Sequence, residues 1–216
     1  MGTVHGVYLK YVGLSAISYA GYSWLSEGNS DSAVGRPSGL YEVGRLILGY
    51  SALLNGTIAV LFKMEWGMGI IGKNKKTGQI PSWSYGLFFP FHIPTKLYTH
   101  LHTKFGKHKM KDPATGKSRY DIVPVANEVV PGWYVGGCYG HELGKEWGGV
   151  IDLTVEFPET CRATTKNYLS APTWDGVPLA PDELDRAASF GVEAKKDVSF
   201  IFRKYYGLSF GTYYLL

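Results

Sequence analysis

Two apolar stretches near the N-terminus restrict the fold of this chain more than any other feature. The first covers residues 7–25 (VYLKYVGLSAISYAGYSWL) and the second covers residues 46–62 (LILGYSALLNGTIAVLF). A helix that spans a bilayer needs about 20 mostly apolar residues, and both stretches approach this length. Lys10 lies near an end, where its long side chain can reach the headgroups. We predict a transmembrane helical hairpin in residues 1–65; the alternative is a pair of buried helices in a soluble protein.

The charges that flank these stretches predict an orientation. Eleven Lys or Arg residues and only two acids lie between Lys63 and Arg119, whereas residues 26–39, between the two stretches, hold a single basic residue, Arg36. Basic residues are retained on the cytosolic side of a membrane. We therefore predict that the connecting segment lies outside the cytosol or in a lumen, and that everything after the second stretch faces the cytosol.

Residues 66–119 form a basic region that is rich in proline and aromatic residues. Its first part, residues 80–98, is apolar but contains Pro81, Pro90 and Pro94. A proline inside a helix costs about 3 kcal/mol, so this part is not expected to span the membrane as a regular helix. We interpret it as an interfacial or re-entrant segment that lies against the bilayer.

The second part of this region, residues 104–119, is a basic run. It is either a solvated linker or a segment that contacts anionic lipid through Lys104, Lys107, Lys109 and Lys111. A membrane anchor would hold the run away from nucleic acid. Membrane lipids are therefore the expected partner, and nucleic acid is not.

No cofactor or metal is predicted from the motifs. The segment GMGIIGKN, residues 67–74, nearly matches a phosphate-binding loop, but Asn74 replaces the hydroxyl residue that binds magnesium and no strand precedes the segment. Four histidines lie in the basic region without the spacing of zinc ligands: His92, His100, His102 and His108.

From residue 120 onward the pattern changes to that of an α/β sheet. Residues 180–196 predict a helix, with Pro181 in its first turn and acids at its positive end. Short strands that alternate with a helix are typical of α/β folds. The expected strands are residues 132–137, 148–154, 166–172 and 197–202.

Four segments in this part carry a resemblance to a known family: VPGWYVGG, GGVIDLTVEFPE, YLSAPTWDGVPLAPDELDRA and KKDVSFIF. In this order, residues 120–202 resemble the first half of a dual-specificity phosphatase domain of the protein tyrosine phosphatase superfamily. The branch that looks most similar includes membrane-associated and phospholipid-directed members. The resemblance implies an incomplete phosphatase-like sheet with a flanking helix, followed by a divergent tail, residues 203–216. In a complete relative the substrate would be a phosphoprotein or a phospholipid.

The resemblance also assigns a role to Asp175. In that family, an acid on the turn between the strand and the helix of the third segment protonates the leaving oxygen after a cysteine attacks phosphorus, because an alkoxide leaves poorly without a proton. From the residues alone, Asp175–Gly176 is a turn dipeptide. Asp175 is the one catalytic residue that we predict.

The nucleophile of that family has no counterpart in the sequence. A phosphate-attacking cysteine needs an arginine six residues later to hold the phosphoryl oxygens, but Gly144 and Asn167 occupy these positions after Cys138 and Cys161. No C-x-x-C pair is present, so both cysteines are expected to be reduced thiols.

The sequence after the strand DVSFIF reads RKYYGLSFGTYYLL, without a His-Cys-x5-Arg loop. We predict a membrane-anchored, inactive relative of the phosphatases. The alternative is a noncatalytic membrane protein whose basic region binds anionic lipid or a partner.

Overall fold

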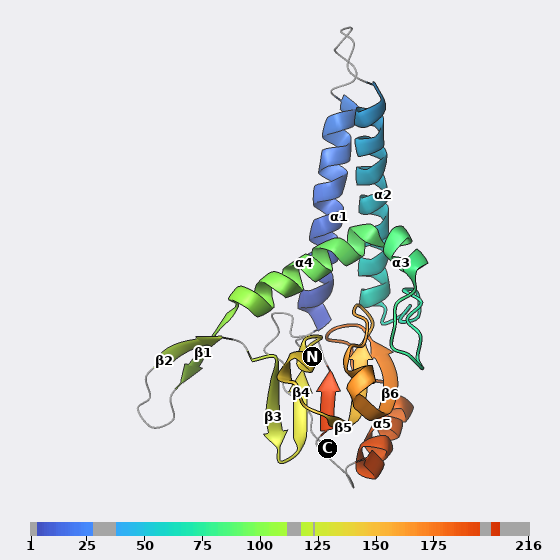
Figure 1. Cartoon of the computed structure of the whole chain (residues 1–216). Helices are drawn as coiled ribbons and strands as arrows, with labels where there is room; N and C mark the ends of the chain where they lie inside the picture. Colours follow the sequence, from blue (N-terminus) through green and yellow to red (C-terminus); the bar gives the residue numbers. More distant parts are fainter. Residues whose placement is uncertain (1–3, 28–37, 112–117, 123, 195–199, 204–216) are drawn as a thin grey trace.

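The computed structural model describes residues 4–27, 38–111, 118–122, 124–194 and 200–203. Figure 1 shows three parts: a long helical hairpin, a pair of shorter helices that crosses the base of the hairpin, and an α/β unit on the far side of this crossing. A small two-stranded sheet projects from the end of the crossing helix.

The hairpin consists of α1 (Val4–Glu27) and α2 (Ser38–Lys63), which pack side by side. Small residues line their contact. The Ser15 hydroxyl of α1 donates a hydrogen bond of 2.7 Å to the Ala52 carbonyl of α2. A Cβ atom at Gly56 would lie 3.2 Å from Ser15 Oγ, so the two backbones approach as closely as glycine allows. Such contacts are typical of helix pairs in membranes.

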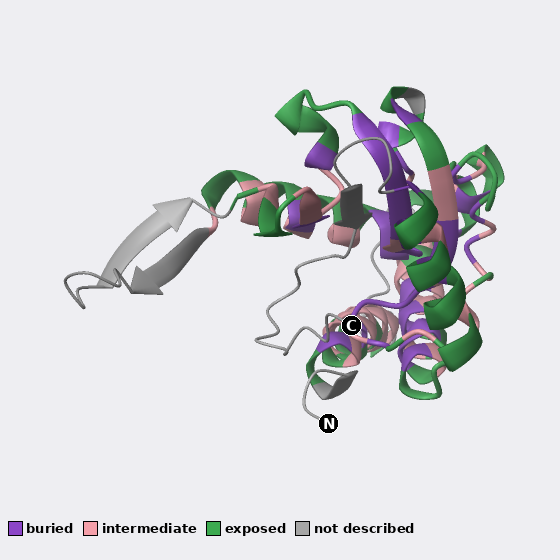
Figure 2. Ribbon diagram, turned by 90° about the horizontal axis from the view of Figure 1, so that it is seen from below, coloured by how far each residue is buried: buried purple, intermediate pink, exposed green. Residues whose placement is uncertain are grey.

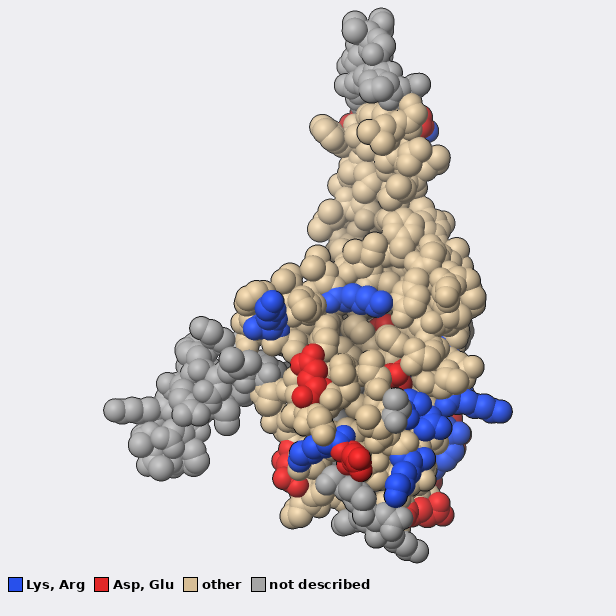
Figure 3. Space-filling model, viewed as in Figure 1, with Lys and Arg blue, Asp and Glu red and all other residues tan. Residues whose placement is uncertain are grey.

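The surface of the hairpin supports a membrane location. Residues 11–26 of α1 and 46–62 of α2 carry no charge, and at 1.5 Å per residue each segment is about 25 Å long. The segment Gly39–Lys63 is the one described helix that is long and apolar enough to cross a membrane, and only 33% of its most apolar part is buried. The core helix of a soluble protein would be mostly buried. Figure 3 shows the hairpin as a surface with charge only at its outer end and at its base.

The two predicted spans differ in composition. The second stretch meets the length and apolarity of a spanning helix by itself. The first stretch does not reach the same apolarity, because Gly, Ser and Tyr replace aliphatic residues in α1. Its contacts with α2 nevertheless place it in the same helix pair.

The proline-rich segment is more helical than its sequence predicts. It forms α3 (Ser82–Leu87) and α4 (Phe89–Phe105), and α4 continues through Pro94. Pro94 has no N–H to donate to the carbonyl of Pro90, four residues earlier. The Asn55 side chain of α2 points its amide at that carbonyl, with Nδ2 3.4 Å from the oxygen. This contact supplies the donor that the helix lacks.

The basic run that follows is not a simple linker. It contains the antiparallel strands β1 (Lys107–Lys111) and β2 (Ser118–Ile122). Both predictions for this run, a solvated segment and a contact with anionic lipid, stay predictions.

The α/β unit contains a five-stranded sheet in the order β3-β4-β7-β5-β6. Strand β3 is antiparallel to β4, and the other pairs are parallel. The four predicted strands and the predicted helix are confirmed, with shifted ends, and β3 is an addition. The bounds are β3 (Ala126–Val130), β4 (Trp133–Gly136), β5 (Trp147–Thr154), β6 (Thr165–Thr173), α5 (Pro181–Ala194) and β7 (Phe200–Arg203), with 3-10 helices at Gly140–Leu143 and Cys161–Thr164.

Each face of the sheet has its own core. Ile151 packs toward α5, where Gly191 lets the Trp133 ring approach so closely that a Cβ atom would lie 2.9 Å from it. Val150 packs on the other face with Trp147 and Cys161. Figure 2 shows that buried residues gather in the strands and at the base of the hairpin.

The direction of the parallel strands places the candidate site. Strands β5, β6 and β7 run toward the hairpin, so their carboxyl ends face its base. In open α/β sheets this edge is where ligands bind.

Candidate functional site at the carboxyl edge of the sheet

The predicted acid lies on a tight turn directly after β6. The N–H of Val177 donates to the carbonyl of Trp174 over 3.0 Å, which closes a four-residue turn. Gly176 adopts a φ of 83°, as the third residue of a type II turn requires. The interpretation of Asp175–Gly176 as a turn is thus confirmed. What the Asp175 carboxyl group can do depends on the residues around the turn.

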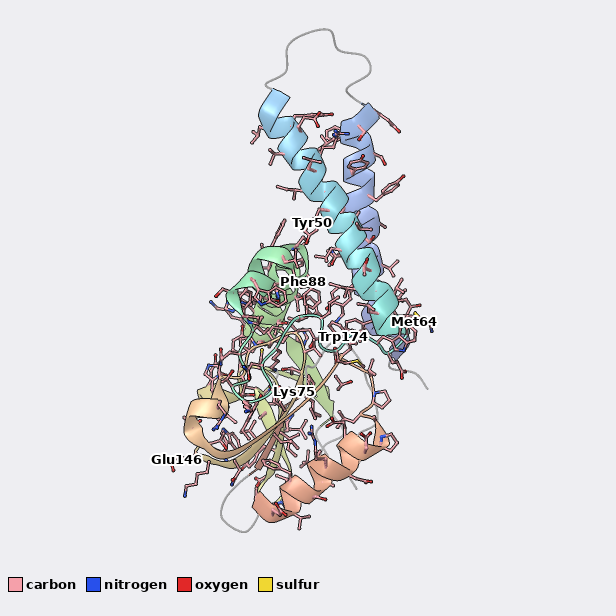
Figure 4. The ribbon with its side chains drawn as sticks, turned by 90° about the vertical axis from the view of Figure 1, so that its right-hand side faces the viewer. Tyr50, Met64, Lys75, Phe88, Glu146 and Trp174 are labelled. Carbon is pink, nitrogen blue, oxygen red and sulfur yellow. The ribbon has the colours of Figure 1, made fainter. Side chains whose placement is uncertain are left out.

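Trp174 fixes the turn against the membrane-proximal helices. Its ring is fully buried and stacks on Phe62 of α2 with 4.5 Å between ring centroids. Phe91 of α4 meets the same ring edge-on at 6.2 Å. The indole N–H donates to the carbonyl of Trp66 over 2.7 Å. Figure 4 shows Trp174 between the base of the hairpin and the sheet.

Asp175 is buried beside a second acid. It is 8% exposed, and its backbone N–H donates to Glu156 Oε1 over 3.3 Å. Glu156, two residues after β5, is 2% exposed, and its Oε2 has no hydrogen-bond partner among the described residues. Burial raises the pKa of Glu156, although backbone N–H groups and Lys73 oppose this shift. The structure therefore places Glu156, whose pKa is raised by burial, beside the backbone of Asp175.

Two groups from the membrane-proximal helices complete this surrounding. The Lys10 ammonium of α1 is near enough to Asp175 and Glu156 to attract both charges. Lys10 also lies over the Tyr98 ring of α4, 4.9 Å from its centroid. Burial, with a smaller contribution from the charge of Asp175, raises the pKa of Tyr98. Helices α1 and α4 thus contribute a cation and a phenol to the vicinity of the predicted acid.

Asp152, near the end of β5, holds a separate polar cluster. The Lys73 ammonium lies 2.5 Å from Asp152 Oδ2, and both side chains are buried. The Tyr168 hydroxyl donates to the same oxygen over 2.8 Å, and the backbone N–H of Thr154 donates to Oδ1 over 3.0 Å. Burial and the charge of Asp152 together raise the pKa of Tyr168. The Asp152 carboxylate is thus held by a cation, a phenol and a backbone N–H.

The contacts of Lys73 show a structural role for the segment that nearly matches a phosphate-binding loop. Lys73 occupies the lysine position of that motif, but its ammonium is held by Asp152 and also donates to the Thr154 carbonyl over 2.7 Å. Gly72 and Gly78, with φ of 73° and 68°, serve close packing in the same segment. The lysine ties residues 64–80 to the sheet.

The two cysteines do not join the Asp175 turn. Cys161 is buried between Trp147 and Val150, near the amino end of β5, whereas Asp175 follows the carboxyl end of β6. Its backbone N–H donates to Glu159 Oε1 over 2.5 Å. Cys138 is half-buried in the turn after β4. Because β4 is parallel to β7, Cys138 lies at the carboxyl edge, but three strands away from β6, whose end carries Asp175.

The predicted lipid-binding lysines are only partly described. Lys104 is exposed in the last turn of α4. Lys107, Lys109 and Lys111 belong to β1, and their side chains lie outside the described residues.

The histidines form no metal site within the described part of the chain. His92 is buried rather than on the surface, and burial together with the charge of Lys96 lowers its pKa to about 4. Its Nε2 lies 3.2 Å from the Ser84 hydroxyl.

Four residues around the site escaped sequence reasoning: Lys10, Tyr98, Glu156 and Asp152. Glu156 and Asp152 lie in the quoted segment GGVIDLTVEFPE, where a buried strand that carries acids at its carboxyl end was the available signal. Lys10 and Tyr98 had no such signal, because each was interpreted as part of the membrane anchor.

Comparison of the chain with protein-family models, with curated proteins and with solved structures finds no match. The phosphatase resemblance therefore depends on the quoted segments and on the geometry described above.

Proposed function

We propose that this chain is a membrane-anchored relative of the dual-specificity phosphatases that lacks the catalytic cysteine loop. One observation carries the proposal: the predicted acid, Asp175, is held on a buried turn at the carboxyl edge of a parallel sheet. That edge is where the family resemblance requires a general acid, and an ordinary surface turn would leave such a carboxylate in solvent.

The strand order supports the same proposal. Strand β7 lies between β4 and β5, so the residues after β7 begin at the centre of the carboxyl edge. In the family, the phosphate loop follows this strand. The sequence from residue 204 to residue 216 has neither a cysteine nor the x5-Arg spacing. We expect the 216 residues to have an acid without a nucleophile.

The proposal is tested by enzyme assay. The full chain, purified in detergent, is assayed on an aryl phosphate beside an Asp175→Ala variant. Nucleophile and phosphate cradle act as a unit, so we expect the same background rate from both proteins. Turnover that disappears in Asp175→Ala would contradict the inactive assignment and reveal a nucleophile elsewhere in the chain.

A noncatalytic lipid-binding or partner-binding protein is the second candidate. It is favoured by the exposed basic residues of α4, which continue into the basic run of β1. The genomic sequence beyond the codon for Phe202 separates the two candidates. A His-Cys-x5-Arg loop encoded there in another reading frame would support the phosphatase relationship, and its absence would favour the second candidate.

The orientation of the chain belongs to the same proposal. We place the α/β unit in the cytosol, because eleven basic residues lie between Lys63 and Arg119 and a single one lies in residues 26–39.

A further inference from the structure

The exposed side of α4 carries two adjoining rows of residues. Residues four apart lie on one side of a helix. One row is apolar and comprises Ile93, Leu97, Leu101 and Phe105, with 60%, 56%, 45% and 67% of each residue exposed. The row next to it is polar and basic and comprises Lys96, His100 and Lys104, all exposed. Four large apolar residues in one exposed row are unusual on a helix that water surrounds.

The rest of α4 is already covered by the protein. Phe91 packs on Tyr11 of α1 with 5.3 Å between ring centroids, and His92 and Thr99 are buried. The helix cannot rotate to bury the apolar row, because another side of it already packs against the core. The row remains exposed, as does the basic row beside it, while Phe91, His92 and Thr99 are buried on the other side of the helix.

The position of α4 indicates what covers the row. The helix crosses the base of the hairpin, where the charge-free surface of α1 and α2 ends. Neighbouring elements also carry exposed apolar residues, with Leu87 on α3 and Val60 on α2 at 52% and 56% exposure. An exposed apolar row at the base of a membrane-spanning hairpin lies where the lipid bilayer can cover it.

The basic row distinguishes a bilayer from a protein partner. An apolar row with lysines along one edge fits the boundary between acyl chains and anionic headgroups, where each side chain finds its own medium. Phe105 at the end of the row and Trp83 on α3 are aromatic residues of the kind enriched at this boundary.

We propose that α4 is an interfacial helix that lies in the plane of the membrane. The apolar row of Ile93, Leu97, Leu101 and Phe105 enters the acyl-chain boundary, and Lys96, His100 and Lys104 face the headgroups. This inference rests on the proposed membrane location of the hairpin. It adds a second, perpendicular contact, which stops the α/β unit from tilting and holds the carboxyl edge of the sheet toward the bilayer.

The test measures the depth of single positions in the full chain. The chain is reconstituted into vesicles of phosphatidylcholine and phosphatidylglycerol, with Cys138→Ser to remove the accessible native thiol. An environment-sensitive fluorophore is attached to Leu97→Cys or Leu101→Cys, and quenching by acyl-brominated lipid is compared with quenching by aqueous iodide. Leu53→Cys on α2, which is 72% exposed, is the membrane reference, and Glu146→Cys in the α/β unit is the aqueous reference. The chain without an added cysteine gives the labelling background.

Brominated lipid is expected to quench the Leu97 and Leu101 positions several-fold more than the Glu146 position, and iodide to do the reverse. His100→Cys, on the neighbouring row, is expected to lie between the two. All of these positions are exposed, so the substitutions remove no core packing.

Each other outcome has a defined meaning. If lipid quenches Leu53 but not Leu97 or Leu101, α4 is not interfacial and the inference is overturned, while the membrane anchor stands. If Leu53 is not quenched either, the anchor itself is wrong. If Leu97 is shielded from iodide without lipid quenching, a protein surface covers the row and the inference is again overturned.

Discussion

At the scale of single residues, two buried acids near one sheet edge have different surroundings. The Asp152 carboxylate contacts the Lys73 ammonium, the Tyr168 hydroxyl and the backbone N–H of Thr154, so it holds these three groups together. Glu156 accepts hydrogen bonds from backbone N–H groups, including that of Asp175, and burial raises its pKa. The first arrangement builds the fold, and the second is the kind that acid catalysis uses.

Removal of the cation from the Asp152 cluster is expected to be severe. Lys73→Met leaves a buried carboxylate without its ion-pair partner, which typically costs 3–5 kcal/mol. We expect the thermal unfolding midpoint in detergent to fall strongly. Lys75→Met, two residues along on the exposed side of the same turn, is the matched control and is expected to change stability by less than about 0.5 kcal/mol. Equal midpoints for the two variants would show that the ion pair does not stabilise the fold.

At the scale of elements, one turn joins parts of the chain that are far apart in sequence. The turn after β6 brings Trp174 onto Phe62 of α2, Phe91 of α4 and the carbonyl of Trp66. These contacts belong to a single core cluster that also contains Tyr11 of α1. The hairpin, the crossing helices and the α/β unit therefore form a continuous packed body rather than units joined by a flexible linker.

Truncation of this tryptophan is expected to loosen the junction. Trp174→Ala removes a fully buried ring, a change that typically costs 3–5 kcal/mol. We expect a lower unfolding midpoint and faster tryptic cleavage at the exposed Lys75 and Lys76. In the control, Trp66→Ala, the removed ring is 62% exposed and the backbone carbonyl that accepts the indole N–H remains. Similar cleavage rates in both variants would argue against a junction centred on Trp174.

At the scale of the whole molecule, charge and shape agree on a single arrangement. The charge-free hairpin leads to a crossing helix with an apolar row, and beyond the crossing lies the charged surface of the α/β unit (Figure 3). In the proposed orientation, with the α/β unit in the cytosol, the candidate site would lie next to the cytosolic leaflet.

This orientation predicts where the chain can be glycosylated. An acceptor tag inserted near residue 29, in the connecting segment, is expected to be modified when the chain is made in the presence of microsomes. A tag near residue 115, in the basic run, is expected to stay unmodified, because lumenal transferase does not reach the cytosol. The reverse pattern would refute the orientation, and modification at both positions would refute the hairpin itself.

The sequence by itself determined those features that depend on local order. The length of the apolar stretches, the strand and helix patterns after residue 120 and the Asp175–Gly176 turn were all readable, because each is set by neighbours within a few residues. The absence of an arginine six residues after either cysteine was equally plain.

Only the tertiary structure decided the features that join distant residues. Helix α4 continues through Pro94 because the Asn55 side chain contacts the Pro90 carbonyl, which has no donor within the helix. Rules for helix formation could not predict this partner. Lys73 forms an ion pair with Asp152 instead of binding a phosphate. The Lys10 ammonium lies near Asp175, whereas its sequence position predicted only a contact with headgroups. Such pairs are set by the way the sheet edge meets the hairpin. The energy of such a pair depends on how deeply it is buried and on which distant residue is its partner. The spacing of residues along the chain predicts neither.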